Sequence, residues 1–246
     1  MKRMLSLVAI GTLALAAPAH AQTPIKISYQ PAVYWAVPFY IATEKKFWAE
    51  AGLTPEFSTF PAGAPQVAAA QAKSWDVGGV GSVPAVLGAA RFGLVTIGIT
   101  NDESKANALM VRGDKFEAFK ANPASIKGQK ILLTTNSTVD YATQSCLKKW
   151  GIAKSDVQLV NLGQAQIISA ITSNNGDLAG VWAPNTYTLE EKAGVKYLCS
   201  GYDSGAVVPG VLVARPDFAK ESPQVVAQFL AVYQRAWTWA KANNKE

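Results

Sequence analysis

Two hydroxyl-bearing stretches of this sequence stand where a strand pattern gives way to a helix pattern. The first is Gly81-Ser82-Val83-Pro84, in which Ser82 is positioned to cap a helix and proline suits the first turn. In the second, Thr134-Thr135-Asn136-Ser137-Thr138, Ser137 and Asp140 have capping-box spacing. Each helix start would present unpaired N–H groups and the positive end of its dipole. Two starts facing one cleft would form a site for an anionic oxygen group; either alone would only cap its own helix.

Aromatic residues near the ends of predicted strands are a second feature that could contribute to a binding site. Tyr34 and Trp35 follow the alternating run at residues 25–29, and Trp182 ends the apolar run at residues 178–182. Rings at such positions can close over a ligand and give it apolar contact. They can equally pack between structural units, and the residues alone leave both alternatives open.

The first 21 residues have the pattern of a cleaved export signal. Lys2 and Arg3 precede an apolar run at residues 4–17, and Ala19-His20-Ala21 supplies a small-x-small cleavage site. The run is too short to remain as a membrane anchor. Cleavage after Ala21 would leave 225 of the 246 residues and remove the only histidine. We therefore expect an exported, soluble protein without histidine.

The loss of histidine argues against most catalytic chemistry. Ser-His-Asp and Cys-His nucleophile systems need it, and two cysteines alone do not make a structural zinc site. The sequence has no phosphate-binding GxxxxGK[ST] motif, and Gly78-Gly79-Val80-Gly81 is a weak dinucleotide signal. Asp102 and Glu103 could form a carboxylate pair, but adjacent acids in a turn are usually solvated. We predict a non-enzymatic protein with no cofactor and no metal.

The charge balance and the cysteine content limit which partners and which cellular compartment are plausible. Without Lys2 and Arg3, the 23 basic residues become 21, against 17 acidic ones, and they are scattered along the chain. Such a mild balance predicts no nucleic-acid partner. Cys146 and Cys199 could pair in an oxidising compartment or remain as two buried thiols.

The order of elements predicts an α/β fold with mainly parallel sheets, because short β-rich runs alternate with helical patterns. Two polar or Gly-rich stretches, residues 101–107 and 200–206, are candidates for crossings between two lobes. The predicted lobes are residues 22–104 plus 206–246, and residues 105–205. The main predicted strands are residues 25–29, 56–60, 75–80, 94–100, 108–111, 130–133, 157–162, 178–182 and 208–214, and the main helices are residues 37–48, 65–74, 83–92, 139–150, 165–173 and 223–242.

An ordered set of short motifs resembles the periplasmic nitrate/sulfonate/taurine-type solute-binding proteins of ABC importers. The resemblance covers nearly all of the chain after residue 21, and its specificity lies in the order and spacing of the motifs. The motifs are Ile-Lys-Ile-Ser-Tyr-Gln at residues 25–30, Trp75-Asp76-Val77-Gly78 leading into Gly81-Ser82-Val83-Pro84, Ile126-Lys127-Gly128-Gln129-Lys130-Ile131, Trp150-Gly151-Ile152, Val181-Trp182-Ala183-Pro184 and Arg215-Pro216-Asp217-Phe218.

The resemblance implies a type II periplasmic-binding-protein fold, with a two-strand hinge, that closes on a small solute and delivers it to a membrane permease. Closure of this kind is a population shift driven by contacts with both lobes. The ligand-binding residues that we predict are Ser82, Ser137, Thr138 and Trp182 around the pocket, Tyr34 and Trp35 at its rim, and Asn101 and Asp203 from the crossing segments.

This chain departs from the family pattern at two points. Taurine-type members carry an acidic residue in the strand before Arg-x-Asp-Phe, where this chain has Pro209-Gly210. An amine-bearing sulfonate would then need Asp102, Glu103 or Asp203 in that role. The chain also ends just after its long helix, whereas family members continue through further helices, as if Glu246 ended a fragment.

The predicted function is that of a monomeric periplasmic solute-binding protein for a small organic anion, with a sulfonate preferred. One alternative is a nitrogenous or aromatic solute, such as a pyrimidine precursor, stacked on Trp35 and Trp182. A second is an enzyme of the same fold, against which the missing histidine argues. A third, the effector lobes of a transcription regulator, conflicts with the export signal.

Overall fold

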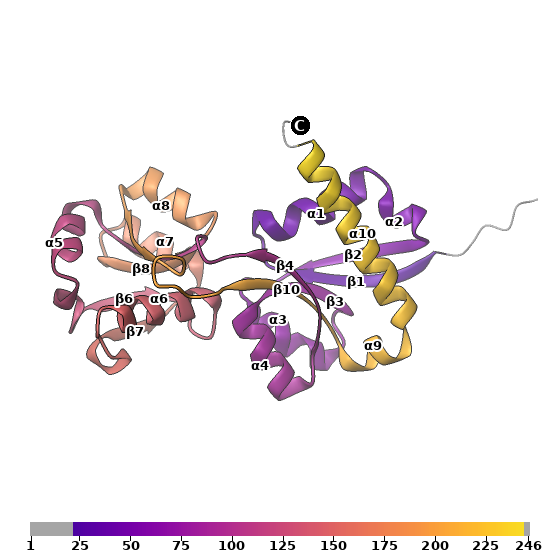
Figure 1. The fold of residues 1–246 in the computed structure, drawn as a ribbon, viewed down its shortest axis with the longest axis horizontal. Coiled ribbons are helices and arrows are strands. Elements are labelled where there is room, and N and C mark those ends of the chain that lie inside the picture. The colour runs from indigo at the N-terminus through magenta and orange to yellow at the C-terminus, as the bar shows by residue number, and fades with distance from the viewer. Residues whose placement is uncertain (1–21, 244–246) are drawn as a thin grey trace, which may run out of the picture.

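The first of two α/β lobes is built around a five-stranded sheet in the computed structural model, which describes residues 22–243 (Figure 1). The strand order is β2-β1-β3-β10-β4. Strand β1 runs parallel to β2 and β3, whereas β10 runs antiparallel to β3 and β4. The strands are β1 (Thr23–Tyr29), β2 (Leu53–Thr59), β3 (Val77–Gly81), β4 (Val95–Asp102) and β10 (Pro209–Ala214).

The second lobe repeats this arrangement with the order β7-β6-β8-β5-β9. Strand β6 runs parallel to β7 and β8, and β5 runs antiparallel to β8 and β9. The strands are β5 (Asn107–Val111), β6 (Lys130–Leu133), β7 (Gln158–Asn161), β8 (Leu178–Trp182) and β9 (Lys196–Ser200). The two-lobed α/β prediction is confirmed, but the sheets are mixed where mainly parallel ones were predicted. The reason is that β5 and β10 each enter a lobe directly from the other one, without the helical crossover that a parallel neighbour needs.

Strand β10 shows how side-chain alternation places helices on both faces of the first sheet. Leu212 and Ala214 belong to a core beneath α1, α2 and α10, whereas Val211 and Val213 belong to a core beneath α3 and α4. The helices of this lobe are α1 (Val33–Glu44), α2 (Phe47–Glu50), α3 (Gly63–Ala69), α4 (Ser82–Phe92), α9 (Pro216–Glu221) and α10 (Pro223–Ala242).

Strand β5 divides the second lobe in the same way. Leu109 and Val111 pack in a core with residues of α5 and α6, and Ala108 and Met110 pack with residues of α7 and α8. The helices are α5 (Phe116–Ala121), α6 (Thr138–Lys149), α7 (Gln164–Thr172) and α8 (Asn185–Ala193). A disulfide joins Cys146 of α6 to Cys199 of β9, which resolves the two alternatives for these cysteines.

A buried ion pair connects two of the sequence motifs in the first lobe. The Arg215 guanidinium lies 3.1 Å from the Asp76 carboxylate, and both side chains are largely buried. The second Asp76 carboxylate oxygen accepts the backbone N–H of Lys26 at 2.9 Å. The Trp-Asp and Arg-Pro-Asp-Phe motifs therefore stabilise the edge of this lobe that lies opposite the crossing segments.

Two chain segments, residues 103–106 and 201–208, connect the lobes (Figure 1). They lie side by side, because the N–H of Glu103 donates to the carbonyl of Val208 at 2.7 Å and that of Tyr202 to the carbonyl of Ser104 at 3.0 Å. The predicted export signal, residues 1–21, lies outside the described residues. Within residues 22–243, no helix is both long and apolar enough to span a membrane.

Candidate functional site

A small cavity between the lobes brings polar and aromatic side chains of both lobes together. Its volume is about 20 Å³, which is room for about one water molecule. Any organic solute is larger, so binding at this place requires the lobes to separate and then close. The lining residues are Gln30, Tyr34, Gly63, Gly81 and Pro84 from the first lobe, Glu103 from the crossing segment, and Ser137, Thr138 and Trp182 from the second lobe.

The start of α6 supplies the anion-binding features of the cavity. Ser137 is the N-cap: its hydroxyl accepts the N–H of Asp140 at 3.3 Å and donates to the carbonyl of Thr134 at 2.6 Å. These bonds confirm the predicted cap. The N–H groups of Thr138 and Val139, in the first turn, have no partner inside the helix. Together with the helix dipole, they favour a negatively charged group at this end.

The start of α4 faces α6 across the cavity, but with a different cap from the predicted one. Gly81 is the N-cap and Ser82 is the first helical residue; of the two, only Gly81 lines the cavity. A Cβ atom at Gly81 would lie 2.5 Å from Cγ2 of Thr138, which is closer than real Cβ contacts. Glycine at this position therefore lets the two lobes approach each other.

Trp182 closes the cavity from the second lobe. Its side chain packs against Ala62 of the first lobe and Val139 of α6, and it is 9% exposed. Tyr34 lies on the first-lobe side, where burial and then the nearby Glu103 charge raise the pKa of its phenol well above the ordinary value. Tyr34 therefore faces a solute as a neutral hydrogen-bond donor.

Glu103 is the charged group of the cavity, and its side chain is 2% exposed. Oxygen Oε2 lies 3.3 Å from the Asn107 amide nitrogen and 3.4 Å from the Thr138 hydroxyl, both longer than strong hydrogen bonds. The Thr138 hydroxyl has a shorter contact, 2.9 Å, with the Asn107 side-chain oxygen. Burial raises the pKa of Glu103 to about 7, partly opposed by the bonds from Asn107 and Thr138.

Four of the eight predicted ligand-binding residues line the cavity: Tyr34, Ser137, Thr138 and Trp182. The other four do not. Trp35 is 1% exposed in the core of the first lobe, where its ring covers Gly79 of β3. Asn101 accepts the hydroxyl of Thr100 at 2.7 Å, and Asp203 is an exposed residue that accepts the Ser200 hydroxyl at 2.7 Å.

Glu103 is the main residue that the predicted ligand set omits. The sequence gives two opposed indications for this residue: adjacent acids in a turn are usually solvated, whereas the departure from the family pattern names Glu103 among three acids that could pair with an amine. Gly210 of β10 makes room for it, since a Cβ atom at Gly210 would lie 2.8 Å from Oε1 of Glu103. The carboxyl group thus occupies the space beside Gly210, where the family resemblance had drawn attention to a missing acidic residue.

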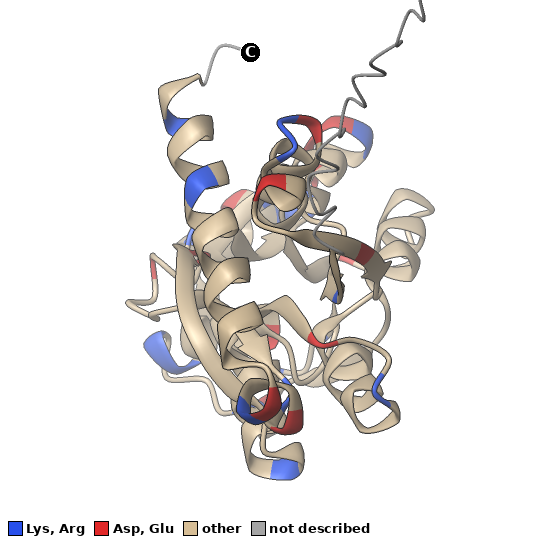
Figure 2. Cartoon of the chain, turned by 90° about the vertical axis from the view of Figure 1, so that its right-hand side faces the viewer, with Lys and Arg blue, Asp and Glu red and all other residues tan. Residues whose placement is uncertain are grey.

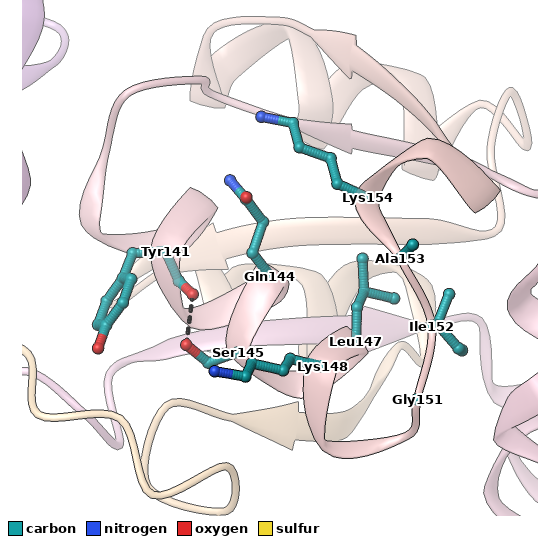
Figure 3. Close-up of a pocket in the computed structure, with 9 residues that line it drawn as sticks. All are labelled: Tyr141, Gln144, Ser145, Leu147, Lys148, Gly151, Ile152, Ala153 and Lys154. Carbon is teal, nitrogen blue, oxygen red and sulfur yellow. Dashed lines mark hydrogen bonds between the residues drawn. The ribbon is translucent and has the colours of Figure 1, made fainter.

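A larger depression lies on the outside of the second lobe, between α6 and the loop that follows it (Figure 3). Its volume is about 540 Å³, and Leu147 and Ile152 lie among its lining residues. Lys148 and Lys154 contribute amines from α6 and from the loop (Figure 3). It is formed by one lobe alone. The interlobe cavity is the better candidate, because buried polar groups of both lobes meet there.

Charged residues of both signs are spread over the face of the first lobe seen in Figure 2. Within residues 22–243, no group of three or more His, Cys, Asp or Glu side chains is arranged to hold a metal ion.

Comparison with known proteins gives the family. A family model described as NMT1/THI5 like matches residues 35–246. The chain belongs to this family. It is 29% identical to a Brucella abortus protein described as a candidate binding protein, over 91% of this chain and 69% of the relative. It is 30% identical to the taurine-binding periplasmic protein of Escherichia coli, over 83% of this chain and 62% of that protein.

Solved structures show the same fold. The periplasmic aliphatic sulphonate binding protein SsuA from Escherichia coli superposes with a TM-score of 0.76 at 22% identity, covering 91% of this chain and 75% of that one. The periplasmic nitrate-binding protein NrtA from Synechocystis PCC 6803 gives a TM-score of 0.73 at 15% identity, over 89% and 62%. This family member thus shares its two-lobed architecture with binding proteins.

Proposed function

We propose that this protein captures a small organic anion, preferably a sulfonate, between its lobes and delivers it to the permease of an ABC importer. One observation carries the proposal: the capped start of α6 meets Tyr34 and Trp182, aromatic residues of opposite lobes, at a single interlobe cavity. The names of relatives that bind taurine or aliphatic sulfonates support the sulfonate class.

The anionic group would sit at the first turn of α6. There it would accept the N–H groups of Thr138 and Val139, and the Thr138 hydroxyl would turn to it from the Asn107 side-chain oxygen, in a site shielded from water. The hydroxyl of Ser137 is already used by Thr134 and Asp140, so its role is to hold the helix start in place. Rings from both lobes would cover the rest of the solute, and these shared contacts would favour the closed form.

We also propose the cellular setting that the sequence predicts. Residues 1–21 act as the export signal, and the protein works as a periplasmic monomer with residues 22–104 plus 206–246 as one lobe and 105–205 as the other. Strand β4 ends at Asp102 and β5 begins at Asn107, which supports the boundary between the lobes at residues 104 and 105. An oxidising compartment suits the Cys146–Cys199 disulfide.

Calorimetric titration of the chain from Gln22 onward with alkanesulfonates, sulfate, nitrate and neutral heterocycles tests this function. We expect a sulfonate to saturate one site. Thr138→Val should weaken its binding about tenfold, the worth of one hydrogen bond to a charged group. Thr172→Val, at an exposed position of α7, is the matched control and should change nothing. Saturation by a neutral heterocycle without response to any sulfonate would overturn the proposal.

A nitrogenous solute is the second candidate, and Glu103 favours it, because a buried carboxyl group can accept an N–H from a heterocycle. Trp182 and Tyr34 would supply the apolar contact. Trp35, which the sequence offered for stacking, lies in the core of the first lobe instead. The heterocycle arm of the same titration tests this alternative.

A further inference from the structure

Two polar side chains at the end of β1 point away from the aromatic core of the first lobe. Ile25 and Ile27 belong to that core, beneath α1, α2 and α10. Because side chains alternate along a strand, Ser28 and Gln30 point to the opposite face of the sheet, toward α3. Ser28 is fully buried, and Gln30 lines the interlobe cavity. The Ile-Lys-Ile-Ser-Tyr-Gln motif therefore connects the interior of the lobe to the cavity.

Gln66 of α3 joins these two polar side chains in a hydrogen-bond network. Its side-chain nitrogen donates to the Ser28 hydroxyl at 2.8 Å and to the carbonyl of Gly79, in β3, at 3.1 Å. A carbonyl can only accept, so the Gly79 contact fixes which end of the Gln66 amide is the nitrogen. The Gln66 oxygen therefore faces the other way, where it accepts the side-chain N–H of Gln30.

The surrounding residues hold the Gln66 amide in this one orientation. A Cβ atom at Gly78 of β3 would lie 2.3 Å from the Ser28 hydroxyl oxygen and 2.9 Å from the Gln66 side-chain nitrogen, so glycine leaves room for the amide. The indole N–H of Trp75 donates to the main-chain carbonyl of Gln66 at 2.8 Å, which fixes the position of α3. Gln66 is fully buried, and a flipped amide would leave buried polar groups without partners.

This network determines which atom of Gln30 faces a solute. The Gln30 nitrogen is bonded to Gln66, and no donor among residues 22–243 is hydrogen-bonded to the Gln30 side-chain oxygen. Gln30 belongs to the first lobe, whereas the proposed anion site, at the start of α6, belongs to the second lobe. The Gln30 oxygen is thus an acceptor for a neutral donor, such as a hydroxyl group, at the end of the solute away from its anionic group.

We propose that Gln66 is a positioning residue that sets the orientation of the Gln30 amide, so that the cavity presents the Gln30 oxygen to a hydroxyl group of the solute. This inference rests on the proposed function and deepens it, because it names a residue outside the cavity that controls selectivity inside it. The competing explanation is that Gln66 only joins α3 to the sheet. That explanation predicts that loss of its amide weakens the binding of all sulfonates alike.

Two solutes of equal size separate these explanations: 2-hydroxyethanesulfonate and 1-propanesulfonate, which differ by a hydroxyl group in place of a methyl group. Calorimetric titration of the chain from Gln22 onward gives the ratio of their affinities. We expect Gln66→Met, which keeps the length of the side chain, to shift this ratio about fivefold against the hydroxyl compound, as for one neutral hydrogen bond. Gln30→Met should shift it equally. Gln71→Met, at an exposed position after α3, should leave it unchanged.

The double variant Gln30→Met with Gln66→Met decides whether Gln66 acts through Gln30. Its affinity ratio should equal that of either single variant, because both residues act on one hydrogen bond to the solute. Two changes that multiply, or a Gln66→Met variant that weakens both sulfonates with an unchanged ratio, would overturn the positioning role and leave the proposed function standing. Failure of the wild type to bind either sulfonate would overturn both.

Side-chain NMR of the wild type tests the orientation without a solute and without a stable Gln66 variant. The Gln30 amide protons are identified by their loss in Gln30→Met. One of them should exchange with water more slowly than those of the exposed Gln71 and should show nuclear Overhauser contacts to the Gln66 side chain, because it is hydrogen-bonded in the folded chain. Exchange as fast as that of Gln71, without such contacts, would overturn the proposal.

Discussion

The buried carboxyl group of Glu103 should make the stability of the ligand-free protein depend on pH. Its pKa is raised from 4.5 to about 7 in the folded chain, so the folded form holds the proton where the unfolded form has lost it. The stability that this group contributes is complete below pH 4.5 and is lost as the pH rises through 7. A difference of about 2.5 pH units corresponds to about 3 kcal/mol at 1.36 kcal/mol per unit. This is an upper bound, because separation of the lobes would hydrate the carboxylate.

Comparing Glu103→Gln with the wild type isolates this effect. The free energy of unfolding of the variant, minus that of the wild type, should rise by up to about 3 kcal/mol between pH 4.5 and 8. Carboxylates whose pKa is lowered, such as Asp156 and Asp203, contribute equally to the pH dependence of both proteins, so their contributions cancel in the difference. Urea unfolding followed by tryptophan fluorescence and far-UV circular dichroism gives both values. A difference that stays constant over this range, or that falls with pH, would refute the reasoning.

Two further predictions concern closure and the disulfide. Gly81→Ala should hold the lobes apart, because its Cβ atom would lie 2.5 Å from Cγ2 of Thr138. We expect solute affinity to fall at least about tenfold and the radius of gyration with solute, from small-angle X-ray scattering, to exceed that of the wild type; unchanged values would contradict the contact. Removing the disulfide by Cys146→Ser with Cys199→Ser should lower the free energy of unfolding in urea by about 4 kcal/mol, because the bond closes a loop with a sequence separation of 53. Wild-type stability in the double variant would show that the bond does not form.

Local sequence was sufficient where a feature depends on neighbouring residues. Ser137 was predicted to cap a helix from its spacing to Asp140, and its hydroxyl does accept the Asp140 N–H. Side chains along β10 and β5 point alternately to opposite faces of the sheet, because a strand has a period of two. Their apolar residues therefore face cores on both sides. The family motifs likewise indicated two lobes, because their order along the chain reflects the order of elements.

The composition of the cavity depended on contacts between distant residues, which only the tertiary structure decided. Tyr34 and Trp35 both follow a strand, but adjacent helical residues point about 100° apart, so Tyr34 faces the cavity and Trp35 the core. Glu103 belongs to a polar run that suggested a solvated turn. Its burial follows from the docking of β10, where Gly210 leaves space, and of α6, where Thr138 approaches from the other lobe. The sequence by itself thus determined the elements and the cap of α6, whereas the charge inside the cavity was set by how the lobes pack.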